Sequence, residues 1–229
     1  MVTGFDRDRA SYEAAVERAI SFSGADHQFF IEAKAERLLE LAARRIGSPE
    51  RLNALDVGCG AGLTDRFLTG RFGDLAGTDV SQTLLQSARA ENPSVRYELA
   101  ERERLPFADA SFDLSFAICV LHHVEVPDRA RFVTEMRRVT RPGGLVVVFE
   151  HNPWNPLTRV VVRNCEFDDG VELIGRRELS SLLRDAGLPP VENSYLLFFP
   201  WRSRVLRRAE RGLDRVPFGA QYVVAGRRA

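Results

Sequence analysis

Residues 55–62 read Leu55-Asp56-Val57-Gly58-Cys59-Gly60-Ala61-Gly62 and carry the strongest structural signal in the chain. A short apolar run around an acidic residue is typical of a buried strand, and three glycines at alternate positions indicate a sharp turn directly after it. Glycine suits such a turn because it accepts backbone angles closed to other residues and lets a ligand lie against the main chain. The stretch therefore predicts a strand and a ligand-binding loop at the carboxyl edge of an open α/β sheet.

On both sides of this loop, short apolar runs alternate with amphipathic patterns of helical period. The alternation favours the α/β class, with a Rossmann-like, doubly wound sheet that is mostly parallel and has an antiparallel last strand. Two helical patterns at residues 9–21 and 26–46 precede the sheet and predict an N-terminal helical cap. We expect strands at residues 54–57, 75–79, 95–99, 112–120, 145–150, 191–199 and 220–225, and helices at 64–69, 81–90, 128–139 and 176–186.

Composition limits the possible functions. The 32 Lys and Arg residues balance the 32 Asp and Glu residues, which disfavours broad electrostatic capture of nucleic acid. The apolar runs are too short to span a bilayer. The three cysteines are widely spaced and form no Cys-x-x-Cys pair, so neither a disulfide framework nor a structural zinc site is expected. The first residues lack the apolar core of a secretory signal, and we therefore expect a cytoplasmic protein.

Polar residues recur where the predicted strands end. Asp79 closes the second strand and precedes Val80, and its carboxylate can accept hydrogen bonds from both hydroxyls of a ribose. Glu101 follows the third strand and can accept from an adenine amino group. A glycine-rich loop also occurs in dinucleotide-binding enzymes, but their pattern has a third glycine where this chain has Leu63. A nicotinamide-dependent oxidoreductase is therefore disfavoured.

This ordered series resembles the class I S-adenosylmethionine-dependent methyltransferases of the small-molecule type. The resemblance covers residues 50–151 by motif and the whole chain by element order. It implies that the methionine part of S-adenosylmethionine lies at Asp56 and the glycine loop, the ribose at Asp79, the adenine at Glu101 and the sulfur near Cys119. The implied cofactor-binding residues are Asp56, Gly58, Cys59, Gly60, Gly62, Asp79, Val80, Glu101, Arg102 and Cys119.

Milder interpretations of these residues stay open. Asp56 and Asp79 can each cap a helix, and residues 101–104 read Glu-Arg-Glu-Arg, which also fits a solvated charge run. Cys59 and Cys119 fit small packing residues as well as ligand contacts. A protein that keeps S-adenosylmethionine, or its demethylated product, as a structural ligand and transfers no methyl group is a further alternative.

Four polar residues indicate where a methyl acceptor lies. His122 and His123 follow the fourth predicted strand, and Glu150 and His151 end the fifth, at the edge where the cofactor is expected. The Leu-His-His segment resembles one found in several bacterial methyltransferases that act on sugar or natural-product hydroxyls. The resemblance implies His122 or His123 as general base, with Glu150 or His151 orienting that base or the substrate. His123 also fits a packing or helix-capping role, and His27 can reach the site as part of a lid.

We therefore predict one methyltransferase domain over residues 1–229, with a cap at 1–48, a cofactor-binding core at 50–151 and acceptor-side elements at 152–229. The expected reaction is O-methylation of a sugar or secondary metabolite, with nitrogen and carbon acceptors left open and the oligomeric state undetermined. No ligand cluster with metal spacing stands out, so no metal is expected. Two Asn-Pro steps around Trp154 predict an irregular loop that faces the substrate. The Arg-rich segment 201–215 fits a docked surface helix, with an anionic membrane surface or lipid-linked acceptor as the less favoured alternative.

Overall fold

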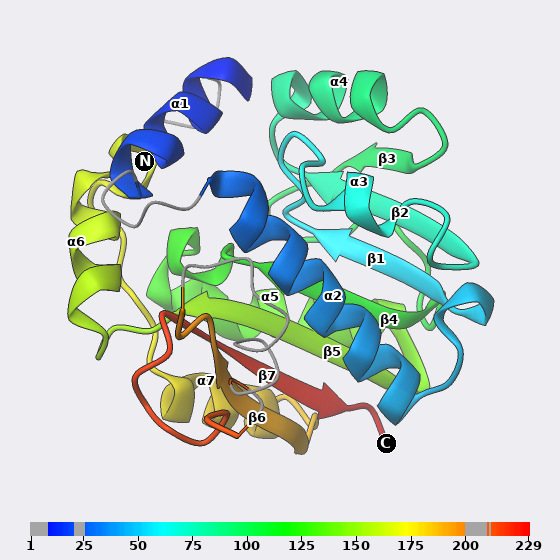
Figure 1. Ribbon diagram of the computed structural model, residues 1–229. Coiled ribbons are helices and arrows are strands. Elements are labelled where there is room, and N and C mark those ends of the chain that lie inside the picture. The colour runs from blue at the N-terminus through cyan, green and yellow to red at the C-terminus, as the bar shows by residue number, and fades with distance from the viewer. Residues whose placement is uncertain (1–8, 21–25, 200–209, 211) are drawn as a thin grey trace.

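A computed structural model describes residues 9–20, 26–199, 210 and 212–229. Its centre is a seven-stranded sheet with the order β3-β2-β1-β4-β5-β7-β6 (Figure 1). Strand β7 is antiparallel to both β5 and β6, while all other neighbouring strands are parallel. The predicted fold class is confirmed. The strands are β1 (Asn53–Val57), β2 (Asp74–Asp79), β3 (Arg96–Leu99), β4 (Phe112–Ile118), β5 (Thr140–His151), β6 (Pro190–Leu196) and β7 (Gln221–Arg227).

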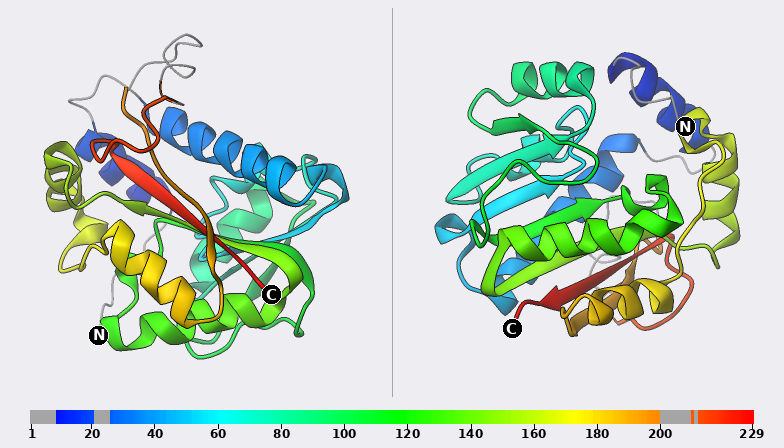
Figure 2. Two further views of the ribbon diagram at one scale, coloured as in Figure 1. Left: turned by 90° about the horizontal axis from the view of Figure 1, so that it is seen from below. Right: turned by 180° about the vertical axis from the view of Figure 1, so that it is seen from behind.

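Helices cover both faces of the sheet. Helix α2 crosses one face, whereas α5 and α7 lie on the other, as the front and back views show (Figures 1 and 2). Two short 3₁₀ turns, η3 and η5, lie near the carboxyl edge. The helices are α1 (Arg9–Ile20), α2 (His27–Arg45), α3 (Asp65–Leu68), α4 (Gln82–Glu91), α5 (Arg129–Val139), α6 (Pro156–Asn164) and α7 (Arg176–Asp185), and the turns are η3 (Leu121–His123) and η5 (Glu166–Asp168).

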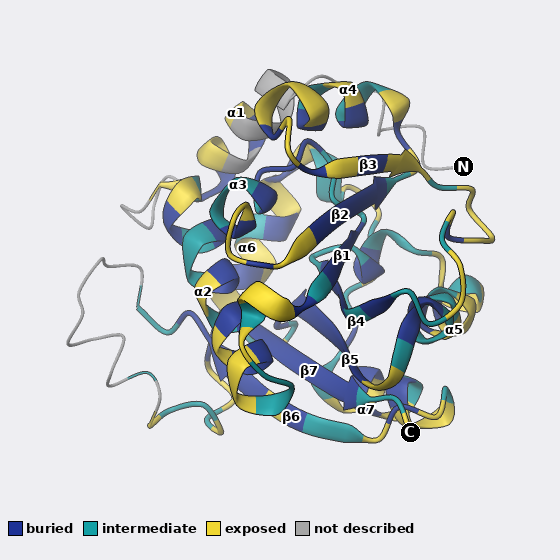
Figure 3. Cartoon of the chain, turned by 90° about the vertical axis from the view of Figure 1, so that its right-hand side faces the viewer, coloured by how far each residue is buried: buried dark blue, intermediate teal, exposed yellow. Residues whose placement is uncertain are grey.

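The middle strands are buried on both faces, as their dark blue colour in Figure 3 shows. Along β5, Val147 packs into the core cluster that includes Leu38 and Leu41 of α2. The next residue, Val148, belongs to the opposite cluster with Met136 of α5. Successive strand residues point to opposite faces, so a near-continuous apolar run is required in a sheet covered on both sides.

Helix α2 is fixed at its start and along its length. The side chain of Asp26 accepts a hydrogen bond from the backbone N–H of Phe29 at 2.7 Å and caps the helix. Farther along, the buried carboxylate of Glu192 on β6 receives three arginine side chains from α2. These are Arg37 at 3.0 Å, Arg44 at 2.8 Å and Arg45 at 3.0 Å. The contacts hold α2 across the sheet, so its inner face is presented to the carboxyl edge in a fixed position.

Several boundaries differ from the sequence prediction, most clearly those of β4, β5 and β6. Strand β4 ends at Ile118 because Cys119 takes a φ of 58°, which no strand residue adopts. Strand β6 likewise ends at Leu196, where Leu197 takes a φ of 61°. Strand β5 begins at Thr140, earlier than predicted.

Helix α6 replaces the irregular loop predicted after β5. The Asn155 side chain accepts from the backbone N–H of Thr158 at 3.1 Å and caps the helix, and Pro156 stands at its first position. Proline is compatible with that position, because the first helical N–H has no intrahelical partner. Most of the Arg-rich segment 201–215 lies outside the described residues. Among the residues described, no helix is long and apolar enough to cross a membrane.

Candidate active site

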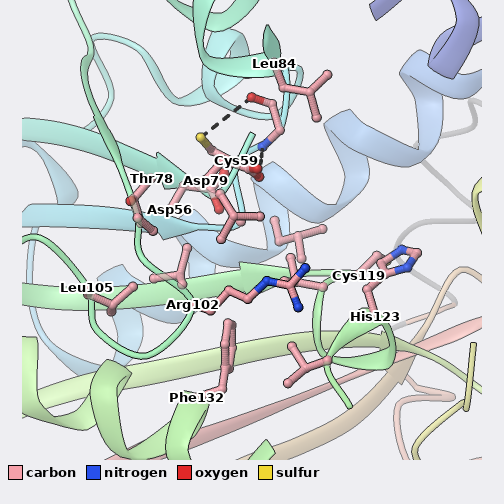
Figure 4. A pocket seen from close by; sticks show the side chains of 18 of the residues that line it. Asp56, Cys59, Thr78, Asp79, Leu84, Arg102, Leu105, Cys119, His123 and Phe132 are labelled. Carbon is pink, nitrogen blue, oxygen red and sulfur yellow. Dashed lines mark hydrogen bonds between the residues drawn. The ribbon is translucent and has the colours of Figure 1, made fainter. Parts of the chain in front are cut away.

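A cavity of about 320 Å³ opens at the carboxyl ends of β1, β2 and β4 (Figure 4). Its volume lies in the range of small-molecule sites, roughly 300–1,000 Å³. Of the ten residues predicted to bind a cofactor, only Gly62 is not among its lining residues. A Cβ on Gly62 would instead lie 2.6 Å from the side-chain nitrogen of Asn92, so this glycine serves packing behind the loop. The other nine predicted residues all reach this one cavity.

The glycine loop presents bare backbone to this cavity. Gly58 has a φ of 79°, and a Cβ there would lie 2.6 Å from Cγ1 of Val120. Gly60 has a φ of 54°, and a Cβ there would meet no atom within 4 Å. Gly58 thus permits a close approach to the segment after β4, whereas Gly60 leaves open space in which a ligand can contact the main chain.

Asp79 is fixed at the end of β2 by two backbone donors. Its Oδ2 accepts from the N–H of Gly60 at 2.9 Å, and its Oδ1 accepts from the N–H of Ser81 at 2.9 Å. Burial raises the pKa of this carboxyl above its usual range. Each oxygen retains a lone pair, so the carboxylate can still accept hydrogen bonds from a ligand. Val80 beside it is 50% exposed and adds an apolar wall to the cavity.

Asp56 lies against a second buried carboxyl, Asp65, which was not predicted from the sequence. Burial and the charge of Asp65 raise the pKa of Asp56 well above its usual range, and burial also raises the pKa of Asp65. The hydroxyl of Tyr97 donates to Oδ2 of Asp65 at 2.7 Å. Oδ1 of Asp56 has no hydrogen-bond partner among the described residues. Two buried carboxyls in contact cannot both ionise easily, so the pair favours a shared proton.

Lys34 of α2 is a further cavity residue that was not predicted from the sequence. The side chain is only 7% exposed, and its Nζ donates to Sγ of Cys119 at 3.8 Å. A thiol is a weak acceptor for an ammonium group. Lys34 is the single lysine in a chain rich in arginine, which is the signal that could have selected it. The ammonium therefore has capacity for a stronger anionic partner in the cavity.

Glu101 and Arg102 form the outer wall. Both are exposed, and the backbone of Glu101 forms an isolated antiparallel β-bridge with that of Arg104. Figure 4 shows the Arg102 side chain extending across the cavity toward its centre. Both residues line the cavity as predicted, although their exposure also fits the solvated charge run considered from the sequence.

Glu150 organises the histidines at the acceptor side. It is fully buried, its Oε1 accepts from the N–H of Leu121 at 2.7 Å, and its Oε2 accepts from the N–H of His151 at 3.2 Å. Oε2 also lies 2.7 Å from Nδ1 of His122. These bonds hold η3 against the end of β5. Glu150, His122 and His151 do not line the cavity, whereas His123 does and is shown there in Figure 4.

The histidines differ in charge. Burial would lower the pKa of His122, but the carboxylates of Glu150 and Asp168 outweigh it and raise the pKa to about 10. Burial and the charge on His122 lower the pKa of His123 and of His151 to about 4. Burial would raise the pKa of Glu150, but His122 lowers it to about 2. The cluster thus holds one cationic and two neutral imidazoles.

Asp168 of η5 also joins this cluster. Its Oδ1 lies 3.5 Å from Nε2 of His122 and 3.4 Å from Nε2 of His123. No metal-ligand cluster was predicted from the sequence, yet these three side chains can hold a cation in the structure. Asp168 is distant in sequence and reaches the histidines only through the fold, so spacing could not reveal it.

The Asn-Pro segment, which was predicted to face the substrate, uses its side-chain amides for contacts within the chain. The side chain of Asn152 donates to the carbonyl of Gly219 at 2.8 Å, and that of Asn155 donates to the carbonyl of Phe218 at 2.7 Å. Trp154 is 76% exposed and does not line the cavity. Both amides are used to join this segment to the residues before β7. His27, by contrast, lines the cavity as the lid hypothesis requires.

Comparison with known proteins identifies the family. A family model described as a methyltransferase domain matches residues 55–148. The chain is 31% identical over 174 residues to the O-methyltransferase resE of Aspergillus sclerotiorum, covering 71% of this chain and 64% of that protein. It is 30% identical over 171 residues to the O-methyltransferase rstn1 of Aspergillus nomiae, covering 71% of this chain and 75% of that protein. The chain belongs to the class I S-adenosylmethionine-dependent methyltransferases.

A solved structure shares the fold of this chain. An S-adenosylmethionine-dependent methyltransferase from Mesorhizobium loti matches this methyltransferase with a TM-score of 0.62 at 24% identity, covering 86% of this chain and 100% of that chain. The likeness confirms the shared fold. The methyltransferase spans between 42% and 64% of the length of three curated relatives that it matches.

Proposed function

We propose that the enzyme binds S-adenosylmethionine in the cavity at the carboxyl ends of β1, β2 and β4 and methylates an oxygen of a small molecule. The observation that carries this proposal is that the glycine loop, Asp79 and His123 all line one cavity. The donor residues and the proposed acceptor residue therefore face the same space. Relatives named as O-methyltransferases support an oxygen acceptor.

The residues present fit the cofactor. The open space at Gly60 admits a ligand against the main chain, and the orphaned Oδ1 of the buried Asp56 can accept from a cationic ligand group. Asp79 would hold the ribose hydroxyls, Val80 would pack on the adenine, and Glu101 and Arg102 would contact its polar edge. When bound, the cofactor supplies an electrophilic methyl group.

His123 is the group we propose as receiving the proton of an acceptor hydroxyl. It is the predicted acceptor-side residue that lines the cavity, whereas His122 is directed to Glu150 and Asp168. His122 and Glu150 would act as positioning residues, because their hydrogen bond fixes the turn that carries His123. Alignment of acceptor and donor would supply much of the rate, as in other displacements between bound reactants.

The proposal is tested with labelled S-adenosylmethionine and a panel of sugars, phenols, carboxylic acids and amines. We expect label in a hydroxyl-bearing acceptor and a loss of about 100-fold in kcat for His123→Ala, the lower end of the usual effect of a general base. Affinity for S-adenosylhomocysteine, measured by calorimetry, should stay unchanged in that variant. Label found only in amines, or an unchanged kcat, contradicts the assignment.

The division of the chain and the class of acceptor, both expected from the sequence, are also part of this proposal. We propose that residues 50–151 form the cofactor-binding core and residues 152–229 the acceptor side, with a sugar or secondary metabolite as acceptor. Helix α2 would close the cavity from the cap, because His27 and Lys34 both line it. Limited screening against secondary metabolites and nucleotide sugars would narrow the acceptor class.

A further inference from the structure

Two histidines and one carboxylate converge next to the cavity. The ligand atoms of His122, His123 and Asp168 all lie within 4.8 Å of one another. The side chain of His122 is buried, and those of His123 and Asp168 are 16% and 11% exposed. We propose that these three residues form a site for a divalent transition-metal ion.

The separations match coordination better than direct hydrogen bonding. Oδ1 of Asp168 lies 3.5 Å and 3.4 Å from the two Nε2 atoms. Charge-assisted hydrogen bonds between such groups are shorter, about 2.7–2.9 Å. Ligand atoms around a tetrahedral zinc ion with bonds of about 2.0–2.2 Å are roughly 3.3–3.6 Å apart. Both separations from Asp168 therefore fit the shared coordination of one ion.

The surroundings supply the orientation that a metal-bound imidazole needs. Nδ1 of His122 lies 2.7 Å from Oε2 of Glu150, so a proton kept there leaves the Nε2 lone pair directed at the cluster once a bound ion has displaced the Nε2 proton to solvent. A carboxylate behind a ligating histidine is the common arrangement at metal centres. Glu150 is itself held by the backbone N–H groups of Leu121 and His151. The orientation is thus built into the end of β5.

Charge balance points the same way. Glu150 and Asp168 place two carboxylates in one buried region, and their ion pairs within the described part of the chain are with histidines. A divalent cation offsets both negative charges. Unbalanced buried charge is costly, so the cluster favours the divalent ion.

Two imidazoles and one carboxylate suit zinc, iron(II), cobalt(II) or manganese(II), and three protein ligands leave a position for another oxygen. Because His123 also lines the cavity, that position can take an acceptor hydroxyl and lower its pKa. In this form His123 would hold the ion, and the hydroxyl would lose its proton to solvent. This role rests on the proposed function, but binding of the ion does not.

The test uses full-length protein treated with a chelator and titrated with ZnCl₂ by calorimetry, and with CoCl₂ by visible absorption. We expect one ion per chain and, with cobalt, absorption bands of a four- or five-coordinate site. Asp168→Asn should weaken metal binding by more than about 100-fold, which exceeds the usual effect of mutating a residue that only hydrogen-bonds to a metal ligand. Asp169→Asn, an exposed neighbour, is the matched control and should bind like the parent protein.

Affinity for S-adenosylhomocysteine reports whether each variant is folded. The proposed site is overturned if the parent protein binds no ion. It is also overturned if Asp168→Asn and His123→Ala bind the ion as tightly as the parent protein, because the ion would then lie elsewhere. Cobalt binding without methylation of any hydroxyl would support the metal site and contradict the proposed function. Methyl transfer to a hydroxyl without ion binding would support the proposed function and contradict the metal site.

Discussion

Alanine at Gly60 should separate cofactor binding from stability. The left-handed backbone angle costs an L-residue roughly 1–2 kcal/mol. Gly70, which follows α3, offers a matched control, because it has a φ of 72° and a Cβ there would meet no atom within 4 Å, but it does not line the cavity. Gly60→Ala and Gly70→Ala should therefore lose similar free energies of unfolding. Both proteins should fold, because domains have about 5–15 kcal/mol of stability.

The two variants should differ in affinity. The new methyl group at residue 60 would occupy space that we assign to the cofactor. Forcing one extra methyl into a filled site costs about 1–3 kcal/mol. This corresponds to roughly 5- to 150-fold weaker binding, since 1.4 kcal/mol is tenfold. Gly70→Ala should bind S-adenosylhomocysteine as the parent does.

Urea denaturation and calorimetric titration with S-adenosylhomocysteine measure the two quantities. Parent-like affinity in Gly60→Ala would show that the loop does not contact the cofactor, and our site assignment would be wrong. An equal loss of affinity in Gly70→Ala would trace the effect to stability. The comparison is informative because backbone strain is the same in both variants.

Two other substitutions test the cavity floor. Lys34→Met should weaken S-adenosylhomocysteine binding about 10-fold or more, because a hydrogen bond to a charged group contributes about 1.5–3 kcal/mol. Glu36→Met, at an exposed position of the same helix, should not change this affinity. Equal affinities of the two variants in calorimetry would contradict a ligand-facing ammonium. The raised pKa of Asp65 means that the folded state binds a proton more tightly than the unfolded state. Protonated Asp65 therefore favours folding at low pH. This contribution to stability is lost as the pH rises above about 4 and through the pKa of the folded state. Asp65→Asn should reduce this fall in the free energy of unfolding between pH 4 and pH 8, as measured by urea denaturation at each pH. The same pH dependence of stability in the variant and the parent would rule out the shared proton.

The strands and the glycine loop could be predicted because their signals are local. A buried strand needs an apolar run, and the loop favours glycine at Gly58 and Gly60 because both have a positive φ. Helix α6 was missed because Asn155-Pro156 was interpreted as a break, although the same pair caps a helix and occupies its first position. Local rules give both outcomes for this pair, and packing against the segment before β7 selects the helix.

The side chains around the cavity could be predicted only in part. His122 and His123 are adjacent in sequence, but one turns toward Glu150 and the other lines the cavity. Three further residues come from separate elements: Asp65 from α3, Lys34 from α2 and Asp168 from η5. No spacing rule relates such residues, because the distances between them are set by how α2 and η5 pack on the sheet.

One contact links the donor loop to the acceptor-side turn. Val120 approaches Gly58 closely enough that a Cβ there would overlap its side chain, and Val120 directly precedes η3. The same turn is held from the other side by Glu150 at the end of β5. The position of His123 is therefore fixed by the loop of β1 and by β5 together, both rigid parts of the sheet. Because the methyl donor and the acceptor must be aligned closely, a turn supported from both sides provides the alignment that the proposed reaction requires.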